Sequence, residues 1–144
     1  MAVSFHDQDI ASGLKDKRKL GNFLTELVKS HRKEVKKVSL TYIFCTDAFL
    51  IDMNQQFLDH DTYTDIITFE LSEKDTEMVG EMYISVERIR ENADKFKVSF
   101  LHELHRVIFH GALHLCGFND KKPALKEEMH RQEDICLQQY GIEK

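Results

Sequence analysis

The spacing of hydrophobic residues along this chain predicts five helices. Apolar side chains recur every three to four residues in several segments, which is the period of an α-helix. The helices predicted in this way cover about residues 17–36, 49–57, 86–95, 100–115 and 123–140. The helix at 100–115 carries apolar residues around most of its circumference, so we expect it to be buried by its neighbours. We expect Gly117 to end that helix, and Ser85 and either Thr46 or Asp47 to cap two others.

Shorter runs rich in β-branched and aromatic residues predict four strands. These runs lie at residues 3–5, 38–45, 65–71 and 78–85. A polar turn separates the last two, so we expect them to form a hairpin or to lie side by side. No repeat, low-complexity tract or proline- and glycine-rich linker divides the chain. We therefore predict a single domain over residues 1–144.

Composition excludes several classes of protein. Of the 144 residues, 42% are hydrophobic, which is enough for a core but in no run approaching the ~20 residues of a membrane-spanning helix. The N-terminus lacks the basic and apolar stretches of a secretory signal, so we expect a cytoplasmic protein without a membrane partner. Cys45, Cys116 and Cys136 form no CxxC pair and fit reduced thiols, chiefly in the core.

Charge is distributed unevenly along the chain. The net charge of −5 argues against a protein that coats nucleic acid by bulk attraction. Residues 13–38 nevertheless hold nine Lys or Arg against three acidic residues, a local balance of +6. A phosphate-bearing partner is expected to dock there, through the side chains of Lys29, Arg32, Lys33 and Lys36. An ordinary solvated helix face explains the same charges equally well.

Two histidines in the buried helix are spaced as metal ligands. His110 and His114 stand four residues apart, so their imidazoles project from one helix face about 6 Å apart in rise. A catalytic zinc ion takes three such ligands and keeps a position open for water. Gly117 reverses the chain, and Asp120 then follows as the expected third ligand, with His130 and Asn119 as alternatives.

Gly111 bears on which chemistry the pair supports. In the HExxH zinc peptidases a glutamate follows the first histidine as general base, and here that position is Gly111. Peptide hydrolysis is therefore disfavoured. We expect the missing side chain to leave room beside the metal for a bulky substrate.

The histidine pair belongs to a longer motif. It consists of His110, Gly111, Leu113, His114, Leu115, Gly117 and Phe118. These residues reproduce most of the signature H-G-x-L-H-L-x-G-[YF]-D-H, so the chain resembles the YbeY family of rRNA maturation endoribonucleases. The resemblance continues in other segments, among them 64–69 and 79–85, and covers about residues 40–141.

The resemblance implies a fold and a metal site. Members of this family are single α+β domains in which helices flank a small mixed β-sheet and a central buried helix carries the metal-binding histidines. Two of the three family histidines correspond to His110 and His114, and the third aligns with Asp120. We therefore expect one Zn²⁺ per chain on His110, His114 and Asp120, with a harder ion such as Mn²⁺ tolerated because Asp120 is a carboxylate.

The resemblance also directs attention to residues around the metal. An arginine of the family's upstream motif falls on Leu58, which cannot bind a phosphate, so another cation must serve. Arg106, one helical turn before His110, is the candidate for that catalytic role. Glu103 is too far along the helix to bind the metal, so it is expected to orient a metal-binding residue or to form a salt bridge with Arg106. Asn54 is expected to line the cleft as a further catalytic residue.

The function implied by the resemblance is metal-dependent cleavage of single-stranded RNA in rRNA processing, including 16S rRNA 3′-end maturation, and in ribosome quality control. The expected partners are rRNA precursors and the small ribosomal subunit, and no DNA. Two other interpretations stay open. One is a zincin-type metallopeptidase, and the other is a non-catalytic ribosome-associated factor with a degenerate metal site.

Overall fold

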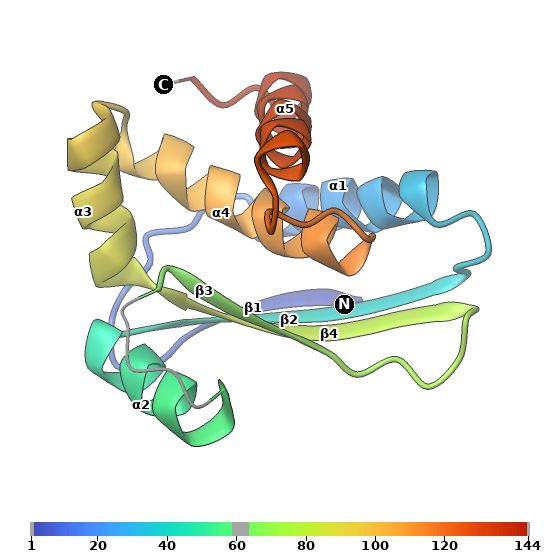
Figure 1. Cartoon of the computed structure of the whole chain (residues 1–144), viewed down its shortest axis with the longest axis horizontal. Helices are drawn as coiled ribbons and strands as arrows, with labels where there is room; N and C mark the ends of the chain where they lie inside the picture. The colour runs from blue at the N-terminus through green and yellow to red at the C-terminus, as the bar shows by residue number, and fades with distance from the viewer. Residues whose placement is uncertain (1, 59–63, 144) are drawn as a thin grey trace.

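The structure is a computed structural model that describes residues 2–58 and 64–143, without the side chains of Phe57 and Leu58. Strands and helices alternate up to β3, after which β4 and three consecutive helices complete the chain (Figure 1). In order they are β1 (Val3–Asp7), α1 (Lys17–His31), β2 (Lys37–Cys45), α2 (Asp47–Leu58), β3 (Ile66–Glu70), β4 (Glu77–Ser85), α3 (Val86–Phe96), α4 (Phe100–Leu115) and α5 (Pro123–Tyr140). The predicted helices and strands are all present, and no described helix is long and apolar enough to cross a membrane.

The strands form one small mixed sheet. Its order is β1-β2-β4-β3, with β1, β2 and β4 parallel and β3 antiparallel to β4. Leu40 of β2 pairs with Gly80 of β4, and Ile67 of β3 pairs with Tyr83. The mixed sheet and the adjacent β3–β4 pair are as predicted, which confirms the α+β fold class.

Helices cover both faces of the sheet. In Figure 1, α1 and α4 lie on one face and α2 on the other, while α5 packs on the side of α4 that faces away from the sheet. Alternate residues of β2 are buried under α1 and α4, as the period of a strand requires. The Tyr42 hydroxyl donates a hydrogen bond to the carbonyl of Ile108 at 2.8 Å and so fastens β2 to α4. A smaller apolar cluster, with Cys45, Leu50 and Ile67 at its centre, lies beneath α2.

The ends of the helices follow the predicted caps. The Thr46 hydroxyl accepts a hydrogen bond from the Phe49 N–H at 3.2 Å, and the Ser85 hydroxyl accepts one from Arg88 at 3.1 Å. Helix α4 ends at Leu115, capped by Cys116, and the expected Gly117 follows directly with a φ of +107°, in the left-handed region.

Gly111 faces the sheet, so the expectation that it clears space for a substrate is wrong. A Cβ atom there would lie 2.9 Å from Ile66 Cδ1 and 3.0 Å from Met82 Cγ. Gly111 is buried in the contact between α4 and the strands β3 and β4. The glycine allows the helix backbone to approach the sheet closely, and in doing so sets the height of His110 above it.

Helix α1 is shorter than predicted, because it ends at His31 rather than near residue 36. Arg32 caps it in a non-helical backbone conformation, and its N–H bonds to the Val28 carbonyl at 2.9 Å. Val35 is buried, and the N–H of Lys36 bonds to the Thr76 carbonyl at 2.7 Å. The chain therefore leaves the helix to enter β2.

Candidate functional site

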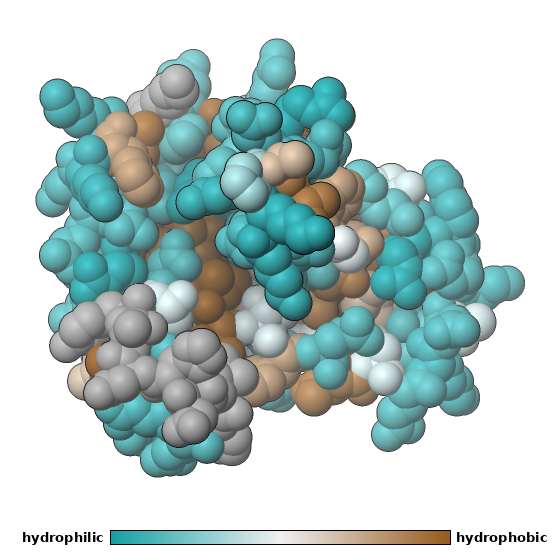
Figure 2. Space-filling view, in the orientation of Figure 1, coloured by the Kyte–Doolittle hydropathy of each residue, from teal (hydrophilic) through white to brown (hydrophobic). Residues whose placement is uncertain are grey.

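A polar cavity of about 180 Å³ lies where α4, α5 and the start of β3 meet. Its lining consists of Asp65, Arg106, His110, Asp120, Lys126, Met129, His130 and Glu133. The view in Figure 2 shows the molecule hollowed beside α5, with hydrophobic residues at the bottom of the hollow and polar ones around its rim. One cavity thus brings together three predicted site residues, Arg106 and His110 from α4 and Asp120 from the loop before α5.

Arg106 is held by buried carboxylates. Its Nε donates to Glu103 Oε1 at 2.9 Å, and its Nη1 donates to Glu133 Oε1 at 2.9 Å, while the Asp65 carboxylate lies 3.9 Å away. The side chains of Glu103 and Glu133 are each 1% exposed. Burial would lower the pKa of Arg106, but the bond and charge of Glu103 and the charge of Glu133 outweigh it and raise that pKa. The expected pairing of Glu103 with Arg106 is confirmed.

Glu133 also orients His110. Its Oε2 hydrogen-bonds to Nδ1 of His110 at 2.6 Å. Burial alone would raise the pKa of Glu133, but the bond to His110 and the charge of Arg106 hold it below its usual value. For His110, burial lowers the pKa, but the hydrogen bond and the charge of Glu133 outweigh burial, so the pKa of His110 is raised above its usual value. The ring therefore has one nitrogen fixed by a carboxylate, and its Nε2 is left for another partner.

His114 lies one helical turn further along α4. Burial lowers its pKa, and the charge of His110 adds to this effect, so its neutral form is favoured. Asp120 acts electrostatically on both histidines and raises the pKa of each. Asp120 therefore lies close enough to both histidines to influence their charge.

The donor set fits part of a metal site. Histidines that bind metals commonly hold a carboxylate or a carbonyl on the other ring nitrogen, and His110 has Glu133 in that place. Within residues 2–58 and 64–143, however, no three His, Cys, Asp or Glu side chains are arranged to hold an ion. One imidazole oriented by a carboxylate and a second imidazole one helical turn along α4 are thus present, and no third donor among the described residues converges on them.

The other predicted site residues lie away from the cavity. Asn54 is buried in α2, at 5% exposure, and does not belong to the described lining. The Leu58 side chain lies outside the described part of the structure. The cysteines are free thiols, with Cys45 and Cys136 buried in the core as expected.

The residues expected to bind RNA also lie outside the cavity. Lys29 is on α1, but Arg32, Lys33 and Lys36 follow its end instead of sharing its face, which corrects the predicted basic helix face. Arg32 forms an ion pair with Glu34 at 2.7 Å and donates to the Leu115 carbonyl at 3.5 Å. Lys33 and Lys36 are exposed.

Glu133 is the central residue of the cavity that the sequence analysis did not identify. Its neighbours on the same helix face, Met129, Cys136, Leu137 and Tyr140, are buried. A carboxylate on an apolar face requires a buried partner, since an unpaired buried charge is strongly unfavourable. That position in the pattern was the available signal. Asp65 and Lys126 gave no comparable signal.

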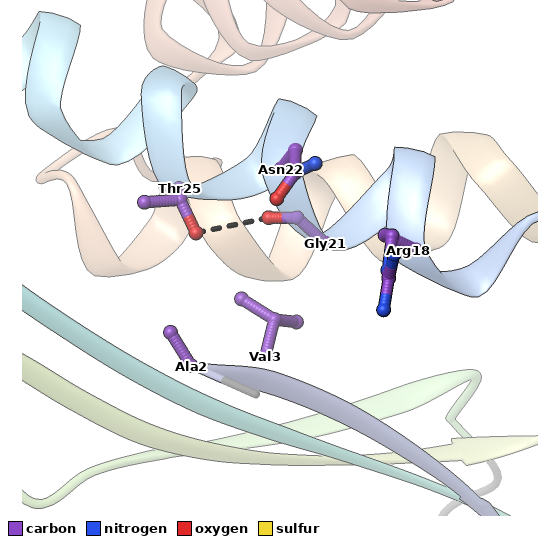
Figure 3. Close-up of a pocket in the computed structure, with 6 residues that line it drawn as sticks. All are labelled: Ala2, Val3, Arg18, Gly21, Asn22 and Thr25. Carbon is purple, nitrogen blue, oxygen red and sulfur yellow. Dashed lines mark hydrogen bonds between the residues drawn. The ribbon is translucent and has the colours of Figure 1, made fainter.

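A second cavity lies between α1 and β1. Its volume is about 340 Å³, and Figure 3 shows its lining residues, with Thr25 bonded to the Gly21 carbonyl at 2.9 Å. Arg18 is the charged side chain in the described lining, which includes no histidine or carboxylate. It shares no described lining residue with the polar cavity, so the acid–base and ligand chemistry belongs to the cavity between α4 and α5.

The fold and the cavity define a class of protein: a single-domain α+β protein in which a buried helix and the helix packed on it surround a polar cleft with histidines, an arginine and carboxylates. The family model described as Endoribonuclease YbeY matches residues 3–141. The chain therefore belongs to the YbeY family, and the resemblance found in its sequence is confirmed.

Individual relatives agree with this assignment. The chain is 45% identical over 123 residues to Endoribonuclease YbeY of Flavobacterium psychrophilum, covering 85% of this chain and 86% of that protein. It is 38% identical over 137 residues to Endoribonuclease YbeY of Parabacteroides distasonis, covering 95% and 94%. The solution structure of TM1509 from Thermotoga maritima matches with a TM-score of 0.57 and 27% identity, over 96% of this chain and 91% of that one.

Proposed function

We propose that this protein is a cytoplasmic, metal-dependent endoribonuclease that cleaves single-stranded segments of rRNA precursors. Its proposed roles are 16S rRNA 3′-end maturation and ribosome quality control, with the small ribosomal subunit as partner. The names of its relatives support the endoribonuclease activity. The observation that carries the proposal is the buried carboxylate of Glu133, which binds Arg106 and His110 at the same time.

His110, His114 and Asp120 are the proposed ligands of one Zn²⁺, with Mn²⁺ as an alternative ion. Glu133 on Nδ1 of His110 supports this assignment, because it leaves Nε2 facing away from the carboxylate. When bound, such an ion acts as a Lewis acid on a phosphoryl oxygen and lowers the pKa of its water. Asp120 supplies the third ligand once its exposed loop side chain turns toward the histidines.

The cations of the cleft divide two tasks between them. Arg106 is bound by Glu103 and Glu133, so in this proposal it fixes Glu133 and, through it, the ring of His110. Lys126 lines the same cavity from the first turns of α5 and is exposed, so it is the proposed contact to the RNA phosphate. Lys29, Arg32, Lys33 and Lys36 are the proposed contacts to more distant phosphates. No catalytic contact is proposed for the buried Asn54.

The test is a His114→Ala variant compared with wild type, both purified without a histidine tag. Metal content by elemental analysis and cleavage of a single-stranded rRNA fragment are measured together. We expect near-stoichiometric zinc in the wild type, sharply less in the variant, and at least a ~100-fold loss of cleavage because the ion's ligand is gone. His6→Ala, at an exposed histidine of β1, is the matched control and is expected to change neither quantity.

Three outcomes contradict the proposal. If the wild type holds no metal and cleaves no RNA, and the His114→Ala variant still co-sediments with ribosomes, the result supports the non-catalytic factor. Casein cleavage that is lost with Asp120→Ala supports the metallopeptidase. RNA cleavage that survives His114→Ala shows that the reaction does not use this site.

A further inference from the structure

A third cavity adjoins the polar one. Its volume is about 240 Å³, and it lies between the end of α3, the first turns of α4 and one residue of α5. The lining consists of Phe96, Val98, His102, Glu103, Arg106 and His130, and most of the exposed surface inside it is apolar. We call it the apolar pocket. Its position matters because Arg106 and His130 line both cavities, so the apolar pocket continues the polar one.

Phe96 forms the outer wall of the apolar pocket. It is the last residue of α3 and is 52% exposed, which is high for a phenylalanine. The ammonium of Lys95 lies 5.7 Å from the centre of its ring. An exposed aromatic ring beside a cation is the arrangement with which proteins bind single-stranded nucleic acids, the ring stacking on a base and the cation contacting the backbone.

The backbone after Phe96 is strained in a way that fixes the pocket. Lys97 has a φ of +58°, in the left-handed region that costs about 1–2 kcal/mol for a residue other than glycine. Its N–H bonds to the Ala93 and Asp94 carbonyls and ends α3 there. The sharp turn brings Phe96 and Val98 to the same pocket although they flank the turn.

We propose that the apolar pocket binds one unpaired nucleobase of the RNA, next to the phosphate that the polar cavity holds. This inference rests on the proposed endoribonuclease function and adds the residues that read the substrate. Pockets for drug-sized ligands span ~300–1,000 Å³, and this one is smaller, which suits a single flat ring system. Phe96 stacks on the base, and the polar edge of the base meets Arg106 and Glu103 at the inner wall.

The pocket explains a preference for single strands. A base inside a duplex is stacked and paired, so it reaches an aromatic wall only after unpairing, at a cost of a few kcal/mol. A base in a loop or a free end pays no such cost. The apolar pocket therefore selects unpaired nucleotides beside the cleavage point. This selection comes mainly from stacking on Phe96 and not from hydrogen bonds that distinguish one base from another.

The test uses Phe96→Ala in the full-length, metal-loaded protein with a single-stranded rRNA oligonucleotide. Stacking on an aromatic ring contributes about 1–3 kcal/mol per base, so we expect RNA binding to weaken ~5- to 150-fold. The KM should rise by a similar factor with little change in kcat, because the base binds equally before and during the reaction. Phe96→Tyr keeps the ring and is expected to restore binding. Leu101→Ala, at a 43% exposed residue of α4 outside the described lining, is the matched control.

Abasic oligonucleotides locate the base. Removing the base at one position beside the cleavage point should weaken wild-type binding as much as Phe96→Ala does, and the variant should lose nothing further on that oligonucleotide. If Phe96→Ala and Leu101→Ala bind RNA equally well while the wild type still cleaves it, the proposal for the apolar pocket is wrong and the proposed function stands. RNA left uncut by the metal-loaded wild type overturns the proposed function, and this inference with it.

Discussion

Gly111 is the residue that decides how closely α4 approaches the sheet. We predict that Gly111→Ala destabilises the protein by about 0.5–2 kcal/mol. The added methyl group would lie 2.9 Å from Ile66 Cδ1 and 3.0 Å from Met82 Cγ, which costs roughly 1–3 kcal/mol, and alanine recovers about 1 kcal/mol in a helix interior. For a domain of this size, thermal unfolding should shift down by about 2–7 °C. Gln138→Ala, at an exposed position of α5, should leave the melting temperature within about a degree. An unchanged melting temperature for Gly111→Ala would refute the close contact.

Single residues were the hardest feature to interpret from the sequence. The spacing of His110 and His114 correctly placed both on α4, since helical geometry alone puts residues four apart on one face. Gly111 lies between them in sequence but points to the sheet, because one residue along a helix is a rotation of about 100°. The sequence showed that this position has no side chain, but not that Ile66 and Met82 are the neighbours that leave no room for one.

At the scale of elements, α5 completes the cleft that α4 begins. We predict that Glu133→Gln destabilises the protein by about 3 kcal/mol and weakens zinc binding about 10- to 100-fold. The amide keeps the shape of the side chain, but it leaves the half-buried guanidinium of Arg106 with one carboxylate fewer and cannot hold His110 in the same way. Chemical denaturation and metal titration measure the two effects.

Glu128→Gln provides the control on the same helix. Glu128 pairs with Arg131 at the surface, at 3.0 Å, and its loss should go unnoticed in both measurements. Acid provides a second check. Because the pKa of Glu133 is below its usual value, its stabilisation is present at neutral pH and is lost as the pH falls through that lowered pKa. Glu133→Gln should therefore lose less stability than the wild type on acidification, and parallel losses would contradict the ion pair.

The elements themselves were largely predictable, and their partnerships were not. Periodicity located each helix and strand to within a few residues, apart from the end of α1, where the buried Val35 and the bonds to Thr76 draw the chain into β2. These are tertiary contacts, and no local pattern encodes them. The bond between Arg106 and Glu133 spans 27 residues for the same reason.

For the whole molecule, the uneven charge predicts how RNA binding responds to salt. Lys33→Glu with Lys36→Glu should weaken binding of rRNA at low salt, and should reduce the slope of log affinity against log salt by about 0.7 for each phosphate that the protein no longer neutralises. Filter binding at several salt concentrations measures both. The difference from wild type should shrink as salt rises. Equal affinity at low salt would show that these exposed lysines take no part in binding.

The dependence of the cleft on α5 has a consequence for the order in which the protein is made. Synthesis runs from the N-terminus, so Arg106 and His110 are joined to the chain before Glu133, which reaches them from the last helix. Until α5 docks, the guanidinium lacks one of its two buried carboxylates, and the imidazole lacks the group that fixes its orientation. A chain whose synthesis stops early therefore carries both histidines without a working cleft, and an unfinished nuclease stays inactive.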